Sequence, residues 1–92
     1  MEKQITQKKI KKYQELTRKA LNIASQRISK GKEKEAKEII EMVSNYLSDS
    51  EYFKKNRDYV NAFAAINYSH GWLDCGVRLK IFDVKDNKLF TV

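Results

Sequence analysis

The sequence predicts an all-α protein, an up-down-up three-helix bundle with a short extended C-terminal tail. Three observations favour this class. The 92 residues include no proline and only three glycines, which leaves few places for turns between strands. Apolar residues recur at steps of three and four over three long stretches. The breaks between these stretches are short, so we expect antiparallel neighbouring helices within a single helical domain, residues 1–92.

The first helix is expected over residues 5–29. Thr6 is a candidate N-cap, and Gly31 is a candidate left-handed stop. One side of this helix carries apolar or small residues, namely Ile10, Tyr13, Thr17, Ala20, Ala24 and Ile28. Lysines lie on the opposite side, so the helix is amphipathic.

The second helix is expected over residues 32–55, where Ala36, Ile39 and Val43 begin the apolar pattern. Asn56 suits a left-handed position at its C-terminal end, and Asp58 could cap the next helix.

The third helix is expected over residues 57–82, and apolar residues cover much of its circumference. Two amphipathic companions can cover only two of its sides, so one flank should meet the tail, a partner or a second copy. The tail, residues 83–92, carries a turn signal at Asp86 and Asn87. We expect Leu89 and Phe90 to pack on an apolar surface, with a short hairpin against residues 81–84 as the alternative.

Three polar residues of the third helix, Asn67, His70 and Asp74, should lie within about 60° of one another. A buried imidazole needs a partner for each nitrogen, and Asp74 at i+4 can accept one hydrogen bond. The main prediction is therefore a structural pair. A ligand-binding or interface role is the alternative, with Trp72 as a candidate anchor. We expect no catalytic residue, metal site or cofactor, because one histidine and one aspartate make a poor ligand set.

Gly71 and Gly76 lie inside this helix, where each costs about 1 kcal/mol relative to alanine. The usual reason for such a glycine is close packing, so another backbone is expected to pass each of them.

The charge is uneven along the chain. Residues 1–34 hold eleven basic residues against three acids, whereas the rest of the chain is nearly balanced. This excess could bind nucleic acid, and RNA in particular, through Lys8, Lys9, Lys11 and Lys12. The alternative is a solvated face that keeps a small basic protein in solution. The single cysteine and the lack of a long apolar run predict a cytoplasmic protein without a membrane segment.

The run from Tyr46 to Leu79 contains Asp49, the pair Tyr52 and Phe53, the segment VNAFAAINYSHGWLD and the following GVRL. In this combination it resembles an archaeal family catalogued as domain of unknown function number 357. The resemblance implies a compact helical domain of archaeal, cytoplasmic origin, and it implies no activity.

The leading functional prediction is a protein-interaction or self-association module that acts through the third helix and the tail, and a homodimer would fit it. RNA binding through the lysine-rich first helix is the alternative. A small-ligand site around His70 and Asp74 is the third hypothesis. An enzyme is not expected, because no nucleophile shares a helix face with His70.

Overall fold

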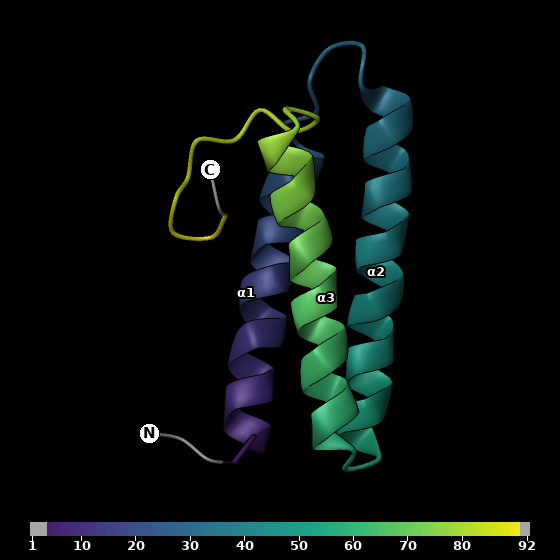
Figure 1. Cartoon of the computed structure of the whole chain (residues 1–92), viewed down its shortest axis with the longest axis vertical. Helices are drawn as coiled ribbons and strands as arrows, with labels where there is room; N and C mark the ends of the chain where they lie inside the picture. Colours follow the sequence, from purple (N-terminus) through teal and green to yellow (C-terminus); the bar gives the residue numbers. More distant parts are fainter. Residues whose placement is uncertain (1–3, 91–92) are drawn as a thin grey trace.

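The computed structural model describes residues 4–90 and contains three helices there, α1 (Gln7–Ser25), α2 (Glu33–Lys55) and α3 (Tyr59–Arg78). The helices run up, down and up, and α3 lies in front of and between the other two (Figure 1). No strand occurs in residues 4–90, so the predicted all-α three-helix bundle is confirmed. Within the same residues, no helix combines the length and the apolarity that a membrane crossing requires.

The core lies where the three helices meet. The larger cluster of buried apolar residues comprises Ala20, Ala24, Ala36, Ile39, Val43, Leu73, Val77, Ile81, Phe82 and Phe90. Alanines on α1 and α2 allow close approach of the helix backbones. Below this cluster the Gln14 side chain donates to Ser50 Oγ at 3.0 Å, and Ser50 donates to the Ala62 carbonyl at 2.7 Å. These bonds join all three helices and satisfy the buried polar groups.

Helix α1 ends at Ser25, so the prediction that it runs to residue 29 is wrong. Backbone groups beyond it bond to the segment after α3 instead of continuing the helix. The Ser29 N–H donates to the Ile81 carbonyl at 2.9 Å, and the Asp83 N–H donates to the Arg27 carbonyl at 2.7 Å. Ile28 and Phe82 thereby form an isolated antiparallel bridge. Gly31 has a φ of 87° and is left-handed as predicted, but it lies in the loop beyond this bridge.

Helix α3 ends at Arg78, four residues before the predicted end at 82. Lys80 adopts a left-handed φ of 60°, and the Ile81 N–H donates to the Gly76 carbonyl at 2.8 Å. With the bond from the Lys80 N–H to the Val77 carbonyl, this is the Schellman arrangement that closes a helix C-terminus. The closure folds Phe82 back onto α3. A Cβ at Gly76 would lie 2.5 Å from Phe82 Cε2, so close packing at Gly76 is confirmed, with a ring rather than a backbone as neighbour.

The C-terminus of α2 is closed in the same way as that of α3, with a left-handed residue directly after the helix. Arg57, with a φ of 61°, takes the left-handed position that was predicted for Asn56, whose φ is −89°. Because Arg57 is left-handed, α3 begins at Tyr59 and not at 57. Asp58 caps α3 by accepting from the Asn61 N–H at 3.2 Å, and Thr6 caps α1 by accepting from the Lys9 N–H at 3.1 Å. Both predicted caps are confirmed.

The tail lies beside α1 and turns back toward the bundle (Figure 1). Asp86 Oδ1 accepts from the backbone N–H groups of Lys88 and Leu89, at 2.7 and 3.3 Å, which confirms the predicted turn. Phe90 is buried and Leu89 is partly buried, as expected. Up to residue 90 the alternative hairpin does not form, and Phe82 pairs with Ile28 instead. Residues 91 and 92 of the predicted tail lie outside the described residues.

Candidate functional site

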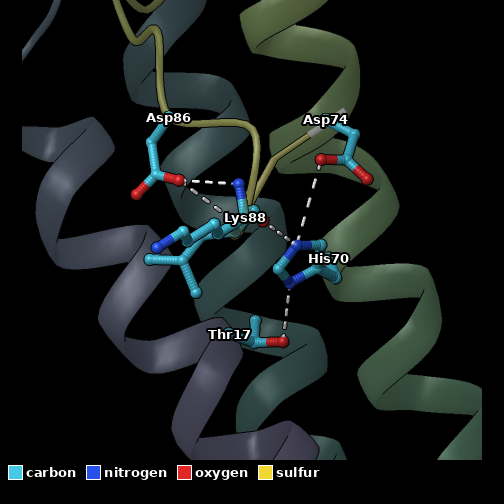
Figure 2. A network of polar contacts seen from close by, with 6 residues as sticks. Thr17, His70, Asp74, Asp86 and Lys88 are labelled. Carbon is cyan, nitrogen blue, oxygen red and sulfur yellow. Dashed lines mark hydrogen bonds and ion pairs between the residues drawn. The ribbon is translucent and has the colours of Figure 1, made fainter. Parts of the chain in front are cut away.

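A groove of about 320 Å³ runs between α1, α3 and the tail, and we call it the His70 groove. It is lined by Tyr13, Leu16, Thr17, Ile66, Asn67, His70, Gly71, Asp74, Lys88 and Leu89. Its size is at the lower end for a small-molecule site. Figure 2 shows the polar contacts at its centre, where the tail passes next to His70.

His70 joins α1 to the tail. Its Nε2 lies 2.6 Å from the Leu89 carbonyl oxygen, and its Nδ1 lies 3.0 Å from Thr17 Oγ1. A carbonyl can only accept, so Nε2 carries the proton and donates. In the neutral ring Nδ1 then accepts from the Thr17 hydroxyl. The tail carbonyl therefore sets the tautomer, and His70 fastens the tail to the bundle.

The predicted polar residues are only partly brought together. Asn67, His70 and Asp74 line the groove, but Asp74 Oδ1 lies 3.9 Å from His70 Nε2, which is an ion-pair distance and too long for a hydrogen bond. Trp72 lies on the other side of α3, in edge contact with Tyr68.

Sequence reasoning missed the actual partners of His70. Thr17 is 53 residues away and Leu89 is 19 residues away, so no local spacing could reveal them.

The groove offers little for catalysis as it stands. Both ring nitrogens of His70 are engaged, so acid–base chemistry would first have to break the contact with the tail. Cys75 is exposed on a different side of α3. Within residues 4–90, no group of three or more histidines, cysteines, aspartates or glutamates could hold a metal ion. The ligand-binding role of Asn67, His70 and Asp74 stays a prediction.

The second candidate surface is the side of α3 that points away from α1 and α2. It consists of Val60, Ala64, Asn67, Tyr68, Gly71, Cys75, Leu79 and, at its C-terminal end, Arg78, and we call it the α3 face. Val60 is 70% exposed, Leu79 62% and Tyr68 55%. The exposed positions of α3 carry no charge until Arg78, whereas most exposed positions of α1 and α2 are charged. The predicted uncovered apolar flank is therefore present.

Gly71 lies near the centre of this face. A Cβ there would meet nothing within 4 Å. The expectation that another part of the chain packs closely on Gly71 is wrong for the described residues, because the glycine faces open space. This geometry fits a glycine that slightly weakens the helix without a packing role, and it also leaves room for a contact from outside the subunit.

Aromatic rings border the α3 face on the side of α2. Tyr68 meets Tyr46 edge to face, with ring centroids 4.7 Å apart, and meets Trp72 at 6.5 Å. Tyrosine and tryptophan at such half-exposed positions are typical of protein interfaces.

The third candidate surface is the lysine cluster at the start of α1. Lys8, Lys11 and Lys12 are exposed, and the Lys9 ammonium lies 5.4 Å from the centre of the Phe63 ring. All four lysines line one shallow hollow. The first turn of α1 contains no acid, so the positive end of the helix dipole adds to their charge.

Comparison with known proteins gives one match. The family model described as "Protein of unknown function (DUF357)" matches residues 12–82, which include nearly all of the bundle. No curated protein and no solved structure matches the chain. Since the family model covers well over half of the chain, this protein belongs to the DUF357 family of proteins of unknown function.

Proposed function

We propose that this protein is a self-association module, in which the α3 face of one copy packs against the same face of a second copy. The observation that carries the proposal is the exposed surface of α3, which is mostly apolar and uncharged from Val60 to Cys75 in a chain whose residues are 34% charged. Apolar patches rimmed by polar residues mark interaction sites on small proteins. The tail packs on its own subunit as far as Phe90, so the proposal centres the contact on α3 and not on the tail.

The charge distribution favours packing of a second copy against α3 and against neither of the other two helices. The chain carries a net charge of +7, so two copies repel each other at most orientations. Helix α1 has six basic residues against one acid, whereas α3 has one of each, Arg78 and Asp74. The α3 face, which is charged only at Arg78, is therefore where a like-charged copy can approach while bringing the fewest like charges together.

The available area also suits a dimer. The bundle measures 41 × 25 × 16 Å, and Figure 1 looks at its broad face with α3 in front. The whole broad face has a footprint of about 1,000 Å², so an interface of the standard ~800 Å² per partner has the α3 face at its centre and takes in the adjoining sides of α1 and α2. A chain of this size also has a marginal core, and association adds buried apolar area.

Sedimentation equilibrium of the full chain tests the proposal. We expect a concentration-dependent dimer, and Gly71→Arg should make it monomeric because it places a long cation at the centre of the face. A Cβ at Gly71 meets nothing within 4 Å, so the substitution begins in open space in the monomer.

The matched control is Ser48→Arg, which adds the same charge at an exposed position of α2 on the side away from the α3 face. It should leave the dimer intact. A monomeric natural chain at several hundred micromolar, or equal effects of the two variants, would contradict the proposal.

A second candidate function is RNA binding through the lysine cluster, and the hollow lined by all four lysines favours it. Binding of this kind weakens steeply with salt, because each phosphate contact releases a counterion. Replacing Lys8 and Lys12 with glutamate should abolish binding to a single-stranded RNA probe. Replacing Lys34 and Lys37, which are exposed on α2, should change it little. Affinity that is indifferent to salt and to the first pair of substitutions would exclude this function.

A further inference from the structure

The fold brings a second group of basic residues to the end of the bundle that carries the lysine cluster. The start of α1 and the turn between α2 and α3 lie at the same end (Figure 1). A hollow of about 660 Å³ lies there, which we call the turn hollow, and its basic residues are Lys54, Lys55 and Arg57. None of these three forms an ion pair within residues 4–90, so their charges are available to a ligand.

The turn hollow adjoins the hollow of the lysine cluster on α1. Gln7 lines the first and Lys11 the second, and these residues are one turn apart on the same side of the helix. Together the two hollows are lined by seven basic residues and two acids, Glu15 and Glu51. Glu51 is already paired with Arg18 at 3.0 Å. Most of the chain's net charge of +7 is therefore concentrated at one end.

The helix ends add to the positive potential at this end. Helices α1 and α3 both begin here, and neither has an acid in its first turn. Helix α2 ends here, and Lys54 and Lys55 in its last turn offset the negative end of its dipole. Asp58 is the acid that caps α3, and its carboxylate accepts from both the backbone and the side chain of Asn61.

Each hollow also contains an aromatic ring. Tyr59 lines the turn hollow and Tyr13 lines the other, and both side chains are half-buried. Tyr13 packs edge to face on Phe63, over which the Lys9 ammonium lies. Cations interleaved with aromatic rings are typical of surfaces that bind single-stranded nucleic acid, where the rings stack bases and the cations hold phosphates.

We propose that this end of the bundle binds single-stranded RNA whose backbone runs from the lysine cluster into the turn hollow. Lys55 and Arg57 hold phosphates there, and Tyr59 stacks a base. This inference rests on RNA binding as the second candidate function, and it adds the α2–α3 turn to that site and names the form of RNA. A duplex fits less well, because its paired bases are not free to stack on a side chain.

The test removes two cations of the turn hollow from the full chain by Lys55→Gln with Arg57→Gly. Lys55 is exposed, and Arg57 has a left-handed φ of 61°, which glycine adopts without strain. Binding of a short fluorescent oligouridylate is followed by anisotropy over a range of salt concentrations. Affinity should fall about tenfold at about 0.1 M salt, and the slope of log K against log salt should fall by about 1.4, since each phosphate contact contributes about 0.7.

The matched control is Lys30→Gln with Lys80→Gly at the opposite end of the bundle. Both lysines are exposed, and Lys80 is left-handed with a φ of 60°, so the same charge is lost with the same backbone change. Affinity should change less than about twofold, because no phosphate contact is lost there. Equal losses in the two double variants would overturn the inference, since only the net charge would then matter.

The outcomes separate this inference from RNA binding itself. Binding that is lost with Lys8→Glu and Lys12→Glu, yet is unchanged by the Lys55 and Arg57 substitutions, would overturn the extension and leave RNA binding standing. A natural chain that does not bind the oligouridylate would overturn both, including a chain that binds only vesicles of anionic lipid. Tighter binding to an RNA duplex than to the single strand would overturn the assignment of the ligand.

Tyr59 gives an independent readout of stacking. Tyr59→Leu should weaken binding of the oligouridylate about tenfold, because it removes the ring on which a base stacks. Tyr59→Phe keeps the ring and should bind as the natural chain does, with circular dichroism to confirm that both variants are folded. Equal affinity of the leucine and phenylalanine variants would overturn the role of Tyr59.

Discussion

The two glycines of α3 should respond to alanine with opposite signs. At Gly71 a Cβ would meet nothing within 4 Å, so the substitution adds only helix propensity. Alanine exceeds glycine inside a helix by about 1 kcal/mol. Gly71→Ala should therefore raise the free energy of unfolding of the monomer by about 1 kcal/mol, or the Tm by about 4–8 °C in a domain of this size.

At Gly76 the same Cβ would lie 2.5 and 2.7 Å from two carbons of the Phe82 ring, and 3.2 Å from Ile39 Cδ1. Phe82 is only 1% exposed, so its ring cannot swing into solvent to make room. Overpacking of this kind costs about 1–3 kcal/mol, and the gain in helix propensity offsets only part of it. Gly76→Ala should therefore destabilise the protein by about 1 kcal/mol, and by at most about 2 kcal/mol.

Urea unfolding followed by circular dichroism measures both variants. The protein should be at low micromolar concentration, because association adds to apparent stability. The same Gly71→Ala protein should associate more weakly, since the added methyl lies in the proposed interface. Equal stability changes at the two glycines would refute the packing described for Phe82. If the Gly71→Ala chain is stabilised but associates as well as the natural chain, the close approach of a second copy to Gly71 is refuted.

Three further predictions concern the core and the tail. Phe90→Ala should lower the free energy of unfolding by about 3 kcal/mol in urea titration, and a loss below 1 kcal/mol would mean that the tail does not share the core. Ser50→Ala removes a hydroxyl that bridges two buried hydrogen bonds and should cost about 1–3 kcal/mol, whereas Ser48→Ala at the surface should cost little. Nitrogen NMR of neutral His70 should show the proton on Nε2, and a proton on Nδ1 would contradict its bond to the Leu89 carbonyl.

Local sequence patterns predicted the helices and two of their caps, because these depend on residues three or four apart. Thr6 and Asp58 are capping residues with a known side-chain chemistry, and both cap as expected. The helix ends at 25 and 78 were missed for a physical reason. Lys80 adopts a left-handed φ without being a glycine, and the bridge between Ile28 and Phe82 competes with both helices for backbone hydrogen bonds.

The candidate sites likewise combine features that local spacing predicts with features that only the tertiary fold creates. The spacing of Asn67, His70 and Asp74 placed them on one side of α3, and the groove contains all three. The partner that sets the His70 tautomer comes from the tail, and only the tertiary fold brings it there. Gly71 and Gly76 look alike in sequence. They differ because Phe82 folds back onto one of them, while the other faces solvent.

The most direct test of the central claim, that a second copy covers the α3 face, is an isotope-filtered NOE experiment. The sample is an equal mixture of labelled and unlabelled full-length chains, in which only contacts between copies give signals. We predict intermolecular NOEs at Val60, Tyr68 and Leu79, and none at Ser44 or Ser48 on the exposed side of α2. Intermolecular NOEs confined to another surface, or none at a concentration of several hundred micromolar, would contradict the account.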